Sequence, residues 1–135
     1  MREVTIKSVY GDVLYVAKGA ADVRAAVEEA VRKGVDLGFA DLRSANLRSA
    51  DLRSANLGFA DLRSANLGSA NLGSANLGSA NLGSADLGSA DLGSADLRSA
   101  DLRFAKGVSP ERSNELLLLR EQVGKIRAYK LVTAD

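Results

Sequence analysis

Leucine recurs at every fifth position through the middle of the chain, and this spacing is the strongest pattern in the sequence. From Val35 to Phe104, units of five residues read Ala, Asp or Asn, Leu, Gly or Arg, and Ser or Phe. The first unit has valine in place of alanine, and residues 35–104 make 14 units without an insertion. An internal repeat of this regularity decides the fold of the region before other signals are considered.

A period of five fits neither regular secondary structure. On an α-helix, with 3.6 residues per turn, a leucine at every fifth position would drift around the axis without forming a stripe. On a strand, successive leucines would fall on opposite faces. We therefore expect the chain to turn a corner at each unit, with alanine and leucine pointing to the axis. Stacked coils would pair their backbones at about 4.8 Å, the usual spacing of strands.

The units from Ala40-Asp41-Leu42-Arg43-Ser44 to Ala100-Asp101-Leu102-Arg103-Phe104 resemble those of the pentapeptide-repeat family. The resemblance implies a mainly β fold, a right-handed quadrilateral β-helix with four units per coil, so that 14 units form about 3.5 coils. The family commonly mixes phenylalanine with leucine at the central position, and its units diverge from each other. Here the central residue is always leucine and the units are nearly identical. This uniformity favours an engineered consensus array, with a recent natural expansion of one unit as the alternative.

Residues 1–34 are expected to form an N-terminal cap. Residues 3–17 suggest a β-hairpin, because two β-branched segments flank Gly11-Asp12, which suits a two-residue type II′ turn. A helix is expected over residues 22–33, where valines recur every four residues and Gly34 can end the helix. Such a cap would cover the unpaired backbone at one end of a solenoid.

Residues 105–135 are expected to form a C-terminal cap, so that small α/β caps close both ends of the array in residues 35–104. Ser109-Pro110 begins a predicted helix that runs to about Gln122, and residues 126–132 alternate as a strand does. Because both ends of the chain would finish in strands, a homo-oligomer can form through these terminal strands.

Residues twenty apart should stack on one face if four units complete a coil. Asp41 would then lie beside Asp61, a like-charge pair that is unfavourable unless nearby arginines alternate with the acids. The asparagines of the middle units can bond along the stack or within their own turns, and the sequence leaves both open; they are Asn66, Asn71, Asn76 and Asn81. Phe39 and Phe59 should stack and, with Phe104, pack on the caps rather than bind a partner.

The residue types required by common catalytic sites are missing. The chain has no cysteine and no histidine, which excludes thiol nucleophiles, His-based triads and His/Cys zinc sites. No lysine or helix follows the Gly-Ser segments as in a phosphate-binding loop, and the aspartates would lie on flat, solvated faces. We therefore expect no enzyme activity, no catalytic residue, no cofactor or metal site, and no small-molecule substrate.

Charge and chain length separate two functional hypotheses. The first is a non-enzymatic structural repeat scaffold that requires no partner. The alternative, implied by the resemblance, is an interaction protein of the DNA-mimic type that binds DNA gyrase. Residues 35–104 hold eight Asp and six Arg, a net charge of −2. Roughly 17 Å of array would have to match about ten DNA charges, so the mimic is poor.

The sequence also predicts which partners and which location the protein has. Arginines interleaved with acids and without aromatic neighbours do not suggest direct binding to nucleic acid. The N-terminus has no apolar signal segment and no run approaches the length of a membrane span. These features favour a soluble, cytoplasmic protein without a membrane partner.

Overall fold

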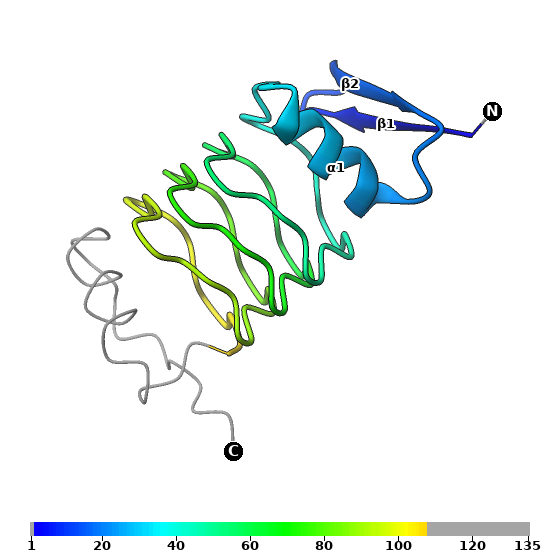
Figure 1. Ribbon diagram of the computed structural model, residues 1–135. Helices are drawn as coiled ribbons and strands as arrows, with labels where there is room; N and C mark the ends of the chain where they lie inside the picture. Colours follow the sequence, from blue (N-terminus) through cyan, green and yellow to red (C-terminus); the bar gives the residue numbers. More distant parts are fainter. Residues whose placement is uncertain (1, 108–135) are drawn as a thin grey trace.

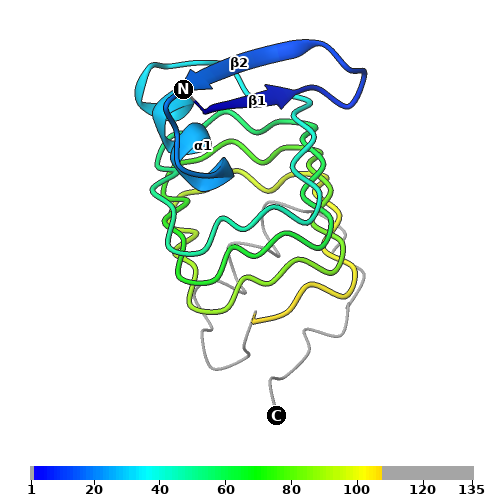
Figure 2. The same ribbon diagram turned by 90° about the vertical axis from the view of Figure 1, so that its right-hand side faces the viewer.

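The computed structural model describes residues 2–107 and consists of a hairpin, a helix and a stack of coils (Figure 1). The hairpin strands are β1 (Glu3–Lys7) and β2 (Val13–Lys18), and the helix is α1 (Val23–Arg32). The coils follow directly, and the hairpin and α1 lie together at the N-terminal end of the stack (Figures 1 and 2).

Parallel bridges between residues twenty apart join each coil to the next, from Asp41–Asp61 to Asp86–Lys106. A coil therefore contains four units, as expected. Around each bridge the Asp or Asn N–H donates to the alanine carbonyl of the preceding coil, and the leucine N–H donates to the following coil. The distances from Asp86 N to Ala65 O and from Leu67 N to Asp86 O are 2.9 and 2.8 Å. The coils pair through isolated bridges and not through long strands, because the chain turns in each unit after only a few residues.

Every unit turns through the same β-turn. In the unit that begins at Ala65, the N–H of Ala70 donates to the carbonyl of Leu67 at 3.0 Å, and the third turn residue, Ser69, has φ +57°. A positive φ at this place is the signature of a type II turn. The fifth residues of all 14 units, Phe39 to Phe104, have φ between 57° and 62° although none is glycine. The left-handed conformation is therefore imposed by the repeat, because it costs L-residues free energy.

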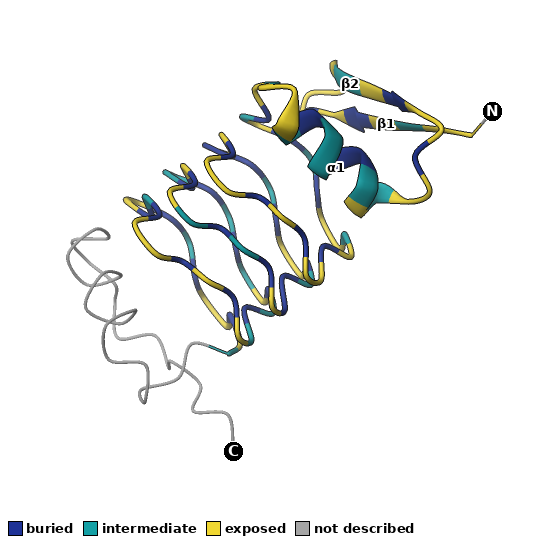
Figure 3. Cartoon of the chain, viewed as in Figure 1, coloured by how far each residue is buried: buried dark blue, intermediate teal, exposed yellow. Residues whose placement is uncertain are grey.

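The core is a column of leucine and alanine inside the coils. All 14 leucines, from Leu37 to Leu102, are at most 7% exposed. Figure 3 shows buried and exposed residues alternating along each coil in the same way from one end of the array to the other. This arrangement confirms that the first and third residues of a unit point inward. Burial of such apolar side chains is the main source of stability for the array.

The hairpin is present where the sequence predicts it, but the predicted two-residue turn at Gly11-Asp12 is wrong. Lys7 pairs with Val13, and the register shifts between Ile6 and Lys7, so the connecting loop is longer. Ser8 closes this loop: its N–H donates to Asp12 O at 2.8 Å, and its hydroxyl accepts from the Asp12 N–H. A side chain that replaces missing ladder bonds allows the wider loop.

Helix α1 begins after Asp22, whose carboxylate accepts from the N–H of Ala25 at 2.8 Å and so caps the first turn. The residues at both ends of the predicted range, 22 and 33, are the cap residues of the observed helix. Its buried residues are Ala26, Val27 and Ala30. These lie on one face because residues three and four apart share a side of a helix.

The predicted C-terminal helix and strand lie outside the described residues, so the C-terminal cap and the boundaries 1–34, 35–104 and 105–135 stay predictions. Among residues 2–107, no helix has the length and apolar character that a membrane crossing requires.

Candidate functional site

The outer faces of the array are organised by a hydrogen bond within each unit. The side-chain oxygen of the Asp or Asn accepts from the N–H two residues later, as in Gly68 N to Asn66 Oδ1 at 2.9 Å. Bonds along the stack are rarer, and the described example joins Asn76 Nδ2 to Asn56 Oδ1 at 3.4 Å. Of the two interpretations left open for the asparagines, the local turn therefore dominates, because the turn N–H lies closer than the next coil.

Arginines in the array bind the aspartate of their own unit. In five units the guanidinium holds the carboxylate through two nitrogens, with Nη2–Oδ2 distances of 2.5 to 2.8 Å; the arginines are Arg43, Arg53, Arg63, Arg98 and Arg103. Contact between coils is weaker, since Arg43 Nε is 3.9 Å from Asp61 Oδ2. The like-charge stacking of Asp41 and Asp61 is thus relieved mainly within each unit.

These pairs keep the aspartates ionised. Hydrogen bonds from Arg53 lower the pKa of Asp51 to about 2. The arginine of the same unit likewise lowers the pKa of the other four paired aspartates: Asp41, Asp61, Asp96 and Asp101. A carboxylate held in this way is a poor general acid or base near neutral pH, because its pKa is shifted away from the working range.

Two charged side chains of α1 complete the exposed edge of the first coil. Inside the array, the Asn71 N–H donates to Ala50 O and the Gly68 carbonyl accepts from Ser49 N. The first coil has no preceding coil. Instead Glu28 Oε2 accepts from the Asp51 N–H at 2.9 Å, and Arg24 Nη1 donates to the Arg48 carbonyl at 3.2 Å. The helix therefore replaces one acceptor and one donor of a missing coil.

The hairpin completes the same edge with backbone groups. The Lys7 carbonyl accepts from Asp41 N at 2.8 Å, and the Val9 N–H donates to Phe39 O at 2.8 Å. Ser8 forms an antiparallel bridge with Ala40. Sequence reasoning expected a cap here but did not identify Arg24 and Glu28. Their spacing of four residues on α1 was the available signal, and their Nε–Oε1 distance is 3.6 Å.

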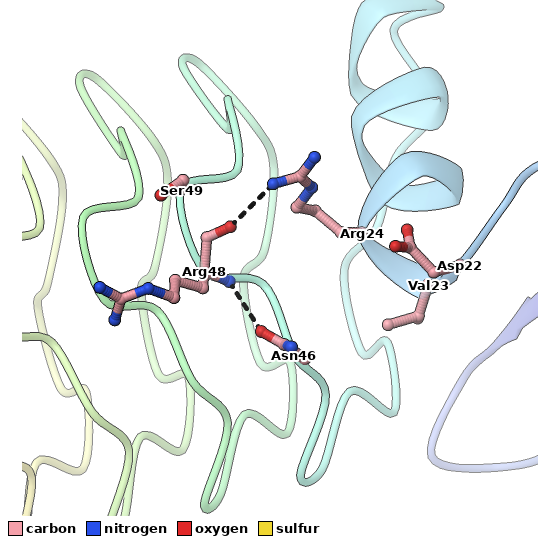
Figure 4. A pocket seen from close by; sticks show the side chains of 6 residues that line it. All are labelled: Asp22, Val23, Arg24, Asn46, Arg48 and Ser49. Carbon is pink, nitrogen blue, oxygen red and sulfur yellow. Dashed lines mark hydrogen bonds between the residues drawn. The ribbon is translucent and has the colours of Figure 1, made fainter.

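A hollow of about 360 Å³ lies between α1 and the first coils (Figure 4), and its lining is Asp22, Val23, Arg24, Asn46, Arg48 and Ser49. Arg24 points across it to the Arg48 carbonyl, and Asn46 accepts from the Arg48 N–H at 3.2 Å. Asp22 is engaged by the helix cap. The polar groups drawn here thus serve the junction between helix and array.

An aromatic stack follows a second face. The rings of Phe39 and Phe59 are 4.9 Å apart and within 6° of parallel, which confirms their predicted stacking. Tyr10 of the hairpin loop lies 5.7 Å from Phe39, so Phe39 packs on the N-terminal segment as expected. Phe59 is 56% exposed and stacks on Phe39 instead, so its predicted packing on a cap is wrong. Phe104 is 72% exposed, and the C-terminal segment on which it was expected to pack lies outside the described residues.

A shallow groove of about 550 Å³ lies beside this stack, and its lining includes Phe39, Phe59, Asn76, Asp96 and Arg98. Gly58 and Gly78 also line it. The groove offers amide groups, aromatic rings and the Asp96–Arg98 ion pair for contact. Among residues 2–107, no three acidic side chains gather as a metal site would require. The expected lack of catalytic, cofactor and metal residues stays a prediction.

Comparisons with known family models and solved structures both point to pentapeptide repeats. Two family models, both described as pentapeptide repeats in eight copies, match residues 33–68 and 54–95, which together span 33–95. None of the curated proteins compared with the chain matches it.

Similar solved structures include three pentapeptide-repeat proteins. One, from the thylakoid lumen of Arabidopsis thaliana, is 32% identical over 49% of this chain and 46% of its own, with a TM-score of 0.48. HetL of Nostoc, involved in regulating heterocyst differentiation, is 40% identical over 53% and 36%, with a TM-score of 0.35. Another Nostoc protein is 39% identical over 65% and 77%, with a TM-score of 0.36. The chain thus spans less than half the length of the first two.

Proposed function

The chain belongs to the pentapeptide-repeat family, and from this premise we propose that it is a non-enzymatic structural repeat scaffold. The observation that supports this proposal is the uniform, filled interior. Every leucine of the array is buried, and stacked coils repeat the same hydrogen bonds. A ligand could therefore reach only the outer faces, where the paired aspartates are held by arginines of their own units.

A scaffold of this kind should tolerate the loss of a whole coil. Residues 65–84 are four identical Ala-Asn-Leu-Gly-Ser units, and their deletion would bring Asp86 to the place of Asn66 with every face preserved. Because repeats contact only their neighbours, we expect the variant to keep the circular dichroism spectrum and to unfold cooperatively at a lower temperature.

Deletion of residues 65–67 is the matched control. It removes one alanine and one leucine and breaks the five-residue period. The leucines after the deletion would then no longer occupy the inward-pointing position of the coil. We expect this variant to be far less stable than the one that lacks a coil. If removal of the complete coil unfolds the chain as severely as removal of three residues, the scaffold proposal fails.

The DNA-mimic alternative predicts inhibition of gyrase in a supercoiling assay. We expect none at micromolar protein, because a mimic needs a strongly negative rod. The array carries a net charge of −2, and five of its eight aspartates are paired with arginines. Inhibition by folded protein would favour the mimic over a scaffold without a partner.

Three finer features complete the proposal. We propose that the array is an engineered consensus, and four consecutive identical units support this origin. An idealised array should melt above about 80 °C, whereas a Tm of about 45–65 °C, usual for natural mesophilic domains, would count against it. We also propose right-handed winding and caps at both ends, which a crystal structure of the whole chain would test. The cytoplasmic location stays a prediction, to be tested by fractionation of cells that express the chain.

A further inference from the structure

One outer column of the array carries two large side chains followed by two small ones. The fifth residues of the units on this face, twenty apart, are Phe39, Phe59, Ser79 and Ser99. Backbone hydrogen bonds between coils hold the column in register, as from Phe59 N to Gly78 O at 2.9 Å and from Ser79 N to Arg98 O at 2.8 Å. In the other columns of fifth residues every member is serine, apart from Phe104 at the end of the array.

The aromatic stack in this column ends at the ring of Phe59. That ring lies parallel to the ring of Phe39, so one of its two faces is covered. Its other face points along the array to the next coil, which has Ser79 in place of a ring. Phe59 is exposed, and the groove beside the stack continues past it along Ser79 and Ser99. The column therefore has room for two more rings, one at the level of each serine.

We propose that this face binds the same face of a second copy of this chain, with the two arrays antiparallel. The two-fold axis lies across the array, between the coils of Phe59 and Ser79. It places Phe59 opposite Ser79 of the partner subunit and, at the next level, Phe39 opposite the partner's Ser99. The rings of the two copies then interleave in one column of four, spaced by the coils at about 4.8 Å. The 4.9 Å between Phe39 and Phe59 matches this spacing.

The order of large and small residues selects this arrangement. With parallel arrays, a two-fold axis would place each phenylalanine against the same phenylalanine of the partner subunit. With antiparallel arrays shifted by one coil, either Phe59 meets the partner's Phe59 or Ser79 faces the partner's Ser79 across a gap. Close packing at an interface disfavours both the overlap and the gap. A two-fold interface must be self-complementary, and only the proposed axis pairs a ring with a serine at every level.

Charges on the same face support the antiparallel arrangement. The first unit of the face has Gly38 where the last has Arg98. Asp36 accepts from the Gly38 N–H at 2.8 Å, and within residues 2–107 no cation pairs with it. The two-fold axis brings Arg98 of the partner subunit over Gly38 and next to Asp36. Because a guanidinium has five N–H donors, Arg98 can hold Asp96 of its own unit and also bind this second carboxylate.

The interface covers four units of one face, so it belongs to the small, weak class of protein contacts. We expect a dissociation constant on the order of 100 μM. Stacked aromatic rings add to the attraction beyond the apolar area that they bury. The dimer would join two arrays side by side and leave their ends free.

An exchange of a large and a small residue within the column tests the pairing with the full chain. Phe59→Ser removes the central ring, and Ser79→Phe places a ring where the partner's Phe59 should lie. Each variant alone should dimerise roughly tenfold or more weakly than the wild type. The double variant reads large, small, large, small along the column. The two-fold axis again pairs every ring of this variant with a serine, so its dimer should return.

Ser74→Phe is the matched control, because Ser74 lies in another column and has φ +58°, against +57° for Ser79. Phenylalanine already occupies such positions in Phe39 and Phe59, so all variants should fold, which circular dichroism checks.

Sedimentation equilibrium up to about 1 mM measures the masses. We expect the wild type, the control and the double variant to approach twice the 14.1 kDa of one chain, and each single variant of the column to stay near one. A wild type that remains monomeric overturns the proposal. So do single variants of the column that dimerise normally, or a double variant that stays monomeric.

Discussion

Replacement of Leu72 by alanine tests whether the interior of the coils is a tightly filled column. Leu72 is fully buried, and the leucines twenty residues before and after it, Leu52 and Leu92, are at most 4% exposed. The backbones of these coils are tied together by hydrogen bonds such as Leu52 N to Asn71 O at 2.8 Å and Leu72 N to Asp91 O at 2.7 Å. The coils can therefore shift little to fill the space left by the missing side chain.

The expected loss follows from that rigidity. Leu→Ala substitutions in cores cost about 2.7–5 kcal/mol, with the larger values where the site cannot collapse. We expect about 3–4 kcal/mol for Leu72→Ala. An entropy of unfolding of about 2.1 cal/mol/K per residue gives roughly 0.28 kcal/mol/K for a chain of this length, so Tm should fall by about 10–15 °C.

Urea and thermal unfolding measure this loss, followed by circular dichroism for the coils and by tyrosine fluorescence, to which Tyr10 and Tyr15 of the hairpin and Tyr129 contribute. Coincident transitions would justify a single free energy of unfolding. Leu72→Met is the control, because a swap that conserves volume should cost less than about 1.5 kcal/mol. A loss below about 1 kcal/mol for Leu72→Ala would contradict a rigid, filled column, since it would mean that the coils close around the gap.

Three further substitutions test the outer faces and the end of the array. Arg53→Gln should raise the pKa of Asp51 from about 2 toward its ordinary value of about 3.9. A carboxylate whose pKa is lowered by folding stabilises the folded state above pH 4, and this stabilisation is lost as pH falls toward 2. The variant should therefore be less stable than the wild type at pH 7 but not at pH 2. An unchanged titration of Asp51, measured by NMR, would contradict this. Gly107→Ala should destabilise by more than about 1 kcal/mol in urea unfolding, because φ is +81° and the new Cβ would lie 2.3 Å from the Gly88 nitrogen. Gly88→Ala, which meets only a side-chain oxygen at 3.1 Å, should cost less, and equal losses would contradict the clash. Ser74→Val should lower stability by about 1–2 kcal/mol because Ser74 has φ +58°, whereas Ser74→Gly should have little effect on Tm; similar losses would argue against left-handed strain.

The repeat itself could be predicted closely because its causes are local. A five-residue period excludes a helix and a flat strand, so a turn in every unit is the remaining solution. The inward position of Leu72, the bridge between residues twenty apart and the stacking of Phe39 on Phe59 all follow from that period. The choice between side-chain bonds along the stack and bonds within the turn required the structure, because both use the same amide groups.

The inside of this protein follows from the sequence alone, which indicates the residues that point to the axis and the places where a hairpin and a helix precede the coils. The way in which the first coil ends is visible only in the three-dimensional structure. Arg24 and Glu28 supply a donor and an acceptor to Arg48 and Asp51, more than twenty residues away. No local pattern encodes such a pairing, because it depends on where the helix lies across the coil.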